Sequence, residues 1–283
     1  MVEARVVTTA RNQLGECPRW HAALQSLFWL DIPMQTLHRY YPATGQRTET
    51  PLDERVSAFA FRRGGGFLFA AGHQIARADE DGRILGVVAT VDIATDARFN
   101  DGAADAAGRF WVGTLNTARR PDNRLYCFGS GSLRVADTLI GASNGIAWGV
   151  DGRTMYLADS PRKTIFAYDF DIASGAATNR RVFVETADKP GVPDGITVDQ
   201  HGGVWCAYWD GWRVVRYDAA GHATASVRIP TPRPTACAFG GERLDILFVT
   251  SAREGIAQDD AYAGDLFAIE TGMKGLAPFE AAI

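Results

Sequence analysis

Hydrophobic and polar positions alternate along this chain in short runs that are typical of β-strands joined by tight turns. Residues Val192–Trp205 show the unit clearly: Asp194-Gly195 is followed by an alternation through Ile196 and Val198, and then by an Asp-x-x-Gly turn at Asp199–Gly202. Apolar residues at every second position predict strands whose side chains alternate between two faces. The stretch therefore predicts two successive strands of a sheet.

The same pattern recurs along the whole chain. Related stretches lie at residues 16–29, 57–69, 100–111, 144–156 and 235–248. In each unit an aromatic residue occupies the second strand: Trp29, Phe69, Trp111, Tyr156, Trp205 and Phe248. These aromatics follow one another at intervals of about 40 to 50 residues, which is the period of propeller blades of four strands. The sequence predicts an all-β, six-bladed β-propeller that forms a single domain over residues 1–283.

The first residues of the chain predict a strand that precedes the first repeat. Residues Val2–Thr8 are mostly apolar and have no partner strand within the first unit. We expect them to complete the last blade, 235–283, because such closure removes the open edge of a sheet array. Helix signals are scarce, since apolar residues sit in short runs bounded by Gly, Asp and Pro.

Composition narrows the classes of partner. The chain has 283 residues, 30 of them glycine, and a formal net charge of −4. A mildly acidic chain without a clustered basic surface is not expected to bind nucleic acid. The N-terminus shows no apolar signal segment, no long apolar run predicts a membrane span, and the four cysteines have no metal-binding spacing. We expect a cytoplasmic protein that acts on small molecules, as a monomer or weak dimer.

Candidate chemistry comes from the residue at the start of each innermost strand. In a propeller these strands line one channel, so the residues should share one mouth. The repeats select these positions: Glu16, Ser57, Asn100 or Asp101, Asn144, Asp194 and Thr235. A one-residue bulge would reconcile the two choices in the third blade. Carboxylate and carboxamide oxygens without His or Cys suit a hard cation, although Asp-Gly and Asn-Gly are also ordinary turn formers.

A set of motifs makes the chain resemble the regucalcin/gluconolactonase family, which includes the senescence-marker and luciferin-regenerating-enzyme-like proteins. The motifs are GECPRW at 15–20, RFND at 98–101, SNG at 143–145, PDG at 193–195 and RPTACAFGG at 233–241. The resemblance covers essentially the whole chain. It implies a six-bladed propeller with one divalent metal ion and hydrolysis of sugar lactones, a role in carbohydrate metabolism.

The resemblance also implies roles for individual residues. Glu16, Asn144 and Asp194 match the metal ligands of the family, and Arg98 and Asn100 match its substrate contacts. For the attack of water on the lactone carbonyl, the residues leave Asp194 and Asp101 as alternative general bases. Oxygen ligands admit Ca²⁺, Mg²⁺, Mn²⁺, Zn²⁺ or Fe²⁺.

The sequence departs from the family in two places, and two rival functions stay open. The run from Leu115 to Arg120 lacks the acidic residue that contacts substrate in the regucalcin branch, and Cys17 replaces a smaller residue after Glu16. The first rival is a hydrolase of phosphotriesters that uses the same metal. The second is a calcium-binding propeller without catalytic activity.

Overall fold

The computed structural model describes residues 3–118, 120–257 and 260–283, and its regular structure is entirely β. Its 24 strands form six four-stranded antiparallel sheets, the architecture of a six-bladed β-propeller. The predicted fold class is therefore confirmed. Over the same residues, no helix has the length and hydropathy of a membrane span.

The chain divides into two compact units of three blades each, and each unit is described by itself. Unit one comprises Met1–Pro51 and Asp188–Pro278, and unit two comprises Leu52–Ala187 and Phe279–Ile283. The prediction that residues 1–283 form one domain stays a prediction.

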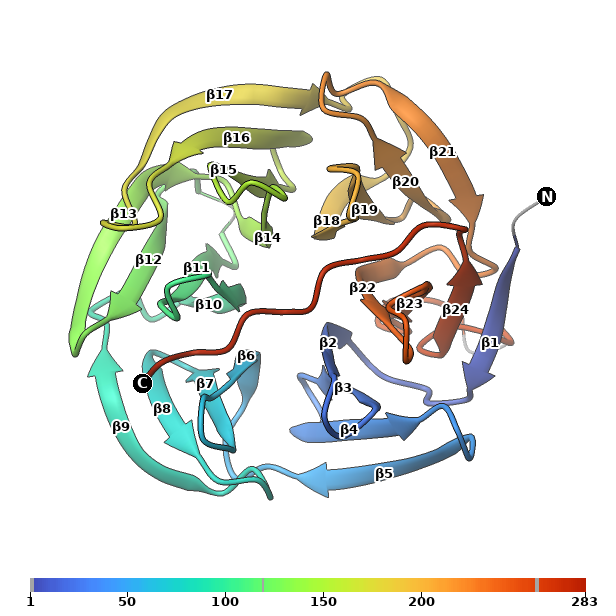
Figure 1. The fold of residues 1–283 in the computed structure, drawn as a ribbon, viewed down its shortest axis with the longest axis horizontal. Helices are drawn as coiled ribbons and strands as arrows, with labels where there is room; N and C mark the ends of the chain where they lie inside the picture. The colour runs from blue at the N-terminus through green and yellow to red at the C-terminus, as the bar shows by residue number, and fades with distance from the viewer. Residues whose placement is uncertain (1–2, 119, 258–259) are drawn as a thin grey trace. The chain divides into compact units, whose positions relative to one another are not determined.

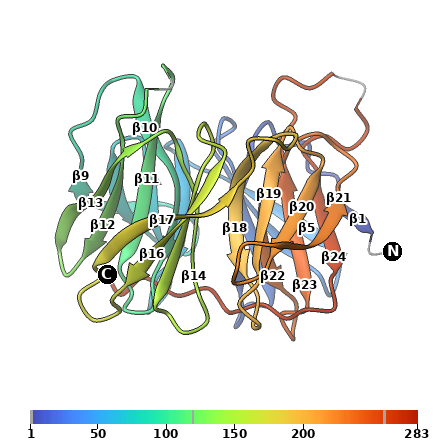
Figure 2. The same ribbon diagram turned by 90° about the horizontal axis from the view of Figure 1, so that it is seen from above.

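Unit one holds blades one, five and six. Blade one consists of β2 (Gly15–His21), β3 (Ser26–Asp31), β4 (Thr36–Tyr41) and β5 (Gln46–Pro51). Blade five consists of β18 (Val192–Val198), β19 (Val204–Trp209), β20 (Arg213–Tyr217) and β21 (Ala223–Arg228), which Figure 2 shows side by side. Blade six consists of β22 (Pro234–Gly240), β23 (Ile246–Ser251), β24 (Leu266–Glu270) and β1 (Ala4–Thr8).

Unit two holds blades two, three and four. Blade two consists of β6 (Val56–Phe61), β7 (Phe67–Ala71), β8 (Gln74–Ala78) and β9 (Ile84–Thr90). Blade three consists of β10 (Ala97–Ala104), β11 (Phe110–Asn116), β12 (Asn123–Gly129) and β13 (Ser132–Ile140). Blade four consists of β14 (Ser143–Trp148), β15 (Thr154–Asp159), β16 (Thr164–Phe170) and β17 (Ala177–Glu185).

The N-terminal strand joins the last blade, as predicted. In Figure 1, β1 lies beside β24, and its register pairs Ala4 with Ile269 and Thr8 with Leu266. The observed strand begins at Ala4, and Val2, the first residue of the predicted strand, lies outside the described residues. Blade six thus combines the first strand of the chain with three strands from its C-terminal part.

The aromatic residues that revealed the repeat form part of the core. Trp29, Phe69 and Trp111 are fully buried, and Tyr156, Trp205 and Phe248 are at most 7% exposed. They lie on the second strands of their blades, and Trp29, Trp111, Trp205 and Phe248 belong to hydrophobic clusters that join neighbouring blades within one unit. These buried aromatic side chains supply apolar contacts between the sheets. The polar candidate residues lie instead on the innermost strands.

Candidate metal and substrate site

The innermost strand of every blade is interrupted near the residue that the repeats selected. In β10, Phe99 pairs with Thr114 and Gly102 pairs with Val112, so that two residues oppose one. This is a β-bulge, which locally re-aims side chains. The bulge predicted for blade three is thus confirmed, and similar interruptions fall at Glu16/Arg19, Val56/Ala58, Ser143/Ile146, Pro193/Ile196 and Pro234/Cys237.

Blade one differs from the others, which corrects the idea that the six selected positions are equivalent. Glu16 still pairs with Leu30 in the regular ladder, and the interruption begins at Cys17. Cys17 is 1% exposed and has a φ of 54°, in the left-handed region that favours glycine. Its amide donates to Glu16 Oε2 at 3.2 Å. In blade one the interruption thus follows Glu16, and the Cys17 amide holds the Glu16 carboxylate close to the backbone.

In unit two the structure brings three predicted site residues together. Asn100 Nδ2 donates to Asn144 Oδ1 at 2.7 Å and to Ser143 O at 2.9 Å. Arg98 Nη1 donates to Asn100 Oδ1 at 3.1 Å and to Phe99 O at 2.8 Å. Both amide hydrogens of Asn100 are thus engaged. Arg98, Asn100 and Asn144 form one hydrogen-bonded line across β10 and β14.

A glycine makes this line possible. Gly113 opposes the bulge of β10, and a Cβ atom built on it would lie 1.8 Å from Ser143 Oγ. No side chain can occupy that space, so only glycine lets β14 approach β11 here. This close approach places Asn144 beside Asn100.

The Asn144 amide is oriented from both ends. Its Nδ2 donates to Ser160 Oγ at 2.7 Å, and its Oδ1 accepts from Asn100. An amide oxygen has two lone pairs, so Oδ1 retains one for a cation or a further donor. The network therefore engages the Asn144 nitrogen with Ser160 and orients its oxygen toward Asn100.

Asp101 lies beside this network. The side chain is 8% exposed, and Asp101 Oδ1 accepts the amide of Gly102 at 2.7 Å. The bulge thus gives the two candidates of the third blade different surroundings. Asn100 takes part in the contacts to blade four through Ser143 and Asn144.

In unit one, β22 connects the strands of Glu16 and Asp194. Contacts join β22 to both β2 and β18. Thr235 Oγ1 donates to Gly15 O, next to Glu16. A Cβ atom at Gly195 would lie 2.3 Å from Ala236 Cβ, so β18 approaches β22 closely beside Asp194. The Thr235 hydroxyl thus links β22 to the backbone of β2 beside Glu16, and it also bonds the Thr250 hydroxyl at 2.9 Å.

Asp194 is a buried residue of β18, the innermost strand of blade five. Its side chain is 4% exposed. Burial raises the pKa of the Cys206 thiol well above its ordinary value, so that this neighbour stays protonated and uncharged. The hydroxyls of Tyr208 and Tyr217 are joined at 2.5 Å in the same blade. All four cysteines are free and buried.

Two acidic residues that sequence reasoning did not single out adjoin the site. Asp31 and Asp159 end the second strands of blades one and four and accept amides from the segments before Glu16 and Asn144. A sequence signal marks them: D-x-P-x-x-T occurs at 31–36 and again at 159–164. The signal lies outside the aromatic and glycine-turn positions that define the repeat, and it occurs in only two of the six units.

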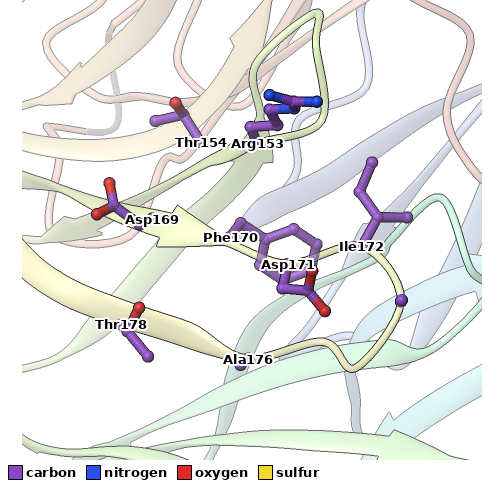
Figure 3. Close-up of a pocket in the computed structure, with 9 residues that line it drawn as sticks. Arg153, Thr154, Asp169, Phe170, Asp171, Ile172, Ala176 and Thr178 are labelled. Atoms are coloured by element: carbon purple, nitrogen blue, oxygen red, sulfur yellow. The ribbon is translucent and has the colours of Figure 1, made fainter.

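A separate cavity lies on blade four. It has a volume of about 740 Å³ and is lined by residues at the start of β15, the end of β16, the turn that follows β16 and the start of β17. Figure 3 shows Asp169, Asp171 and Arg153 around it, together with Phe170 and Ile172. No predicted site residue lines this cavity.

The proposed donors suit a hard metal ion in their chemistry. Two carboxylates and one carboxamide, from Glu16, Asp194 and Asn144, offer only oxygen atoms, as Ca²⁺ and Mg²⁺ prefer. Over the described residues, no group of three or more His, Cys, Asp or Glu side chains is placed to hold a metal. A mixed set with an amide does not require such a group. The orientation of Asn144 Oδ1 by Asn100 and Ser160 fits its assignment as a ligand.

The propeller and these motifs place the chain in a known family. Residues 14–253 match the model of the SMP-30/Gluconolactonase/LRE-like region. The chain belongs to this family, as the motifs indicated.

Relatives cover the whole chain. A pentonolactonase, XacC from Haloferax volcanii, is 35% identical over 293 residues, which covers 100% of this chain and 99% of the relative. Human regucalcin is 32% identical over 295 residues, with 99% of each chain covered. The solved structure of a regucalcin from Agrobacterium tumefaciens, described as a calcium-binding protein, has a TM-score of 0.91 at 28% identity, with coverage of 99% of this chain and 97% of that one.

Proposed function

We propose that this protein is a metal-dependent lactonase that opens sugar lactones to aldonic acids. The family match and the 35% identity to a pentonolactonase support this class of reaction. The observation that carries the proposal is the line from Arg98 through Asn100 to Asn144. It joins the expected substrate contacts to an expected metal ligand by hydrogen bonds of 3.1 and 2.7 Å.

Glu16, Asn144 and Asp194 would hold one divalent cation. Its formal charge would balance the two carboxylates, so a neutral lactone could enter without a net charge penalty. When bound, such an ion polarises the substrate carbonyl and lowers the pKa of water. Calcium, zinc, manganese, magnesium and iron(II) are the candidate ions.

The chain's own residues supply binding and proton transfer. Asp194 or Asp101 accepts a proton from the water molecule that attacks the lactone carbonyl. The bond between the carbonyl carbon and the ring oxygen then breaks, and the ring oxygen receives a proton to become the hydroxyl of the aldonic acid. Arg98 would bind sugar hydroxyls or the ring ester, since its guanidinium offers several N–H donors in one plane.

The direct test is a hydrolysis screen of chelated protein against a series of aldonolactones. A pH indicator reports the acid that ring opening releases, and Ca²⁺, Mg²⁺, Mn²⁺, Zn²⁺ and Fe²⁺ are added back singly. We expect turnover only with metal, and with five- or six-membered sugar lactones. No hydrolysis above the metal-only blank with any ion would contradict the proposal.

A second candidate is a calcium-binding propeller without turnover. The description of the Agrobacterium tumefaciens regucalcin as a calcium-binding protein favours it. The two candidates separate in one comparison. A lactonase loses turnover in Asp194→Ala while its circular dichroism stays unchanged, whereas a binding protein takes up calcium but hydrolyses no lactone in either form.

A further inference from the structure

Asp31 and Asp159 accept corresponding backbone amides in two different blades, and Asp159 Oδ2 also lies 3.4 Å from Arg162 Nε. Asp31 Oδ2 accepts the amide of Gln13 at 2.8 Å, and its Oδ1 accepts that of Leu14 at 3.2 Å. Asp159 Oδ2 accepts the amide of Gly141 at 2.8 Å, and its Oδ1 accepts that of Ala142 at 3.2 Å. Each carboxylate thus binds two successive backbone N–H groups with its two oxygens.

In both blades, the amides that the aspartate accepts come from the two residues at the same distance in sequence before the proposed metal ligand. Gln13 and Leu14 lie three and two residues before Glu16, and Gly141 and Ala142 lie three and two residues before Asn144. In both blades the carboxylate therefore fixes the backbone just before the ligand. Because this arrangement occurs in two blades that belong to different units, we interpret it as a structural motif rather than a chance contact.

The turn that follows each aspartate is also repeated. The residues are Asp-Ile-Pro-Met-Gln-Thr in blade one and Asp-Ser-Pro-Arg-Lys-Thr in blade four. Gln35 and Lys163, at the same position of the motif, have φ angles of 51° and 52°. Each donates its amide to the residue three positions earlier, Ile32 or Ser160. In blade four this turn carries Ser160, which holds the Asn144 amide.

Burial gives these bonds strength. Asp31 is 4% exposed and Asp159 is fully buried. Burial raises the pKa of both carboxyls, and the donated amides offset this only in part. Charge-assisted bonds to backbone N–H groups are stronger than neutral ones, and losing an acceptor leaves buried donors unsatisfied. The segments before Glu16 and Asn144 therefore depend on these two side chains.

We propose that Asp31 and Asp159 are positioning residues that hold the Glu16 and Asn144 segments in the geometry needed for the cation. This inference rests on the metal site of the proposed function. Replacing a residue that orients a metal ligand by hydrogen bonding typically weakens metal affinity by about 10- to 100-fold.

Asp105 and Asp199 provide matched controls within the same chain. Each is fully buried, and one oxygen of each accepts two backbone amides: Ala107 and Arg109 for Asp105, His201 and Gly203 for Asp199. The other oxygen accepts a tryptophan N–H, from Trp111 or Trp205, and pairs at 2.6 Å with Nε of Arg109 or Arg216. Both follow the last residue of their innermost strand, so they support the end of the strand remote from the bulge.

The test measures metal affinity directly by titration calorimetry of the chelated full-length protein with Ca²⁺ and Mn²⁺. We expect Asp31→Asn and Asp159→Asn to bind each ion about 10- to 100-fold more weakly than the wild type. Asp105→Asn and Asp199→Asn should lower the melting temperature and leave the affinity within about twofold. Equal affinity in all five proteins, or equal weakening by the control variants, would overturn the inference.

A wild-type measurement covers the case in which a variant does not fold. Amide hydrogen exchange of Leu14 and Ala142 should slow when cation is added, whereas exchange of Arg109 and Gly203 should not change. Unchanged exchange at Leu14 and Ala142 despite binding would contradict the positioning role. If the wild type binds neither ion, the proposed metal site itself fails, which is a separate outcome.

Discussion

At the scale of single residues, the amide of Asn100 organises the candidate site. It accepts from Arg98 on one side and donates to Ser143 and Asn144 on the other. An aspartate at this position would offer no N–H to Asn144, and a leucine would bind neither neighbour. The sequence presented Asn100 and Asp101 as equivalent choices, and the bulge, a property of the pairing between strands, separates them.

Replacing Arg98 tests whether this arginine contacts substrate. We expect Arg98→Ala to raise KM for a sugar lactone by about 10- to 100-fold, the effect of losing one or two hydrogen bonds to a charged group. Affinity for the cation should change by less, since Asn100 keeps its bonds to Asn144. Steady-state kinetics and metal titration of the same variant give both values. A larger loss in metal affinity than in KM would show that Arg98 serves the metal site instead.

Replacing Asp194 tests whether this carboxylate takes part in the reaction. Asp194→Asn keeps the shape of the side chain and removes both its charge and its basicity, so kcat should fall by about 100-fold or more. Ser57→Ala is the matched control, because Ser57 is similarly buried at the same position of blade two and its hydroxyl donates to the backbone oxygen Ala70 O at 3.3 Å. A similar kcat in the two variants would argue against Asp194.

At the scale of the element, the sequence revealed the inner strands of each blade better than the outer ones. The third strands β4 and β20 contain only buried and half-buried positions, so their apolar residues stand out in the sequence. The fourth strands of blades one and five, β5 and β21, are polar and largely exposed. A strand with one partner and a solvent-facing edge has little hydrophobic pattern, so periodicity does not detect it.

In the candidate site too, short sequence motifs predicted some residues, whereas features that depend on strand pairing could not be predicted. Short motifs were sufficient to select Arg98, Asn100 and Asn144, which the structure brings together. The left-handed backbone of Cys17 and the interruption of all six inner strands depend on which strands pair, and no local spacing encodes that. The D-x-P-x-x-T turns were present in the sequence but gain meaning only from the amides that Asp31 and Asp159 accept.

Blade one contains a histidine that should make its stability sensitive to acid. Burial lowers the pKa of His38 to about 3, and the ring stacks on Trp29 at 4.8 Å. Glu49 lies 3.8 Å from His38 Nδ1, but a neutral ring makes no ion pair, and the charge of Arg47 lowers the pKa further. The stabilising contribution is therefore present above the unfolded pKa of about 6.5 and is lost as the pH falls toward 3.

We expect the free energy of unfolding to drop by roughly 2–4 kcal/mol between pH 7 and pH 4 because of this one histidine. Urea denaturation at both pH values measures the drop. His38→Phe keeps an aromatic ring against Trp29 and should show a correspondingly smaller drop. His222→Phe, at an exposed turn, should match the wild type. If His38→Phe and the wild type respond equally to acid, the histidine is not buried in its neutral form.

At the scale of the molecule, the first strand ties the beginning of the chain to its C-terminal part. Unit one is assembled from Met1–Pro51 and Asp188–Pro278, and β1 pairs with β24 inside it. Successive side chains of β1 pack against different hydrophobic cores. Val6 packs against the core that blades five and six share, and Val7 packs against the core that blades six and one share. A strand of five residues thus contributes to two hydrophobic cores.

This arrangement predicts that the N-terminal strand contributes to stability through its apolar side chains rather than through its presence alone. Val6→Asp and Val7→Asp each place a charge against an apolar core, and we expect each to lower the free energy of unfolding by about 1–3 kcal/mol. Arg5→Asp changes a neighbouring exposed residue of the same strand and should cost less than about 0.5 kcal/mol. The midpoint of urea denaturation compares the three variants. Equal midpoints would mean that β1 is dispensable, and closure of blade six by β1 would then not explain how the two ends of the chain are held together.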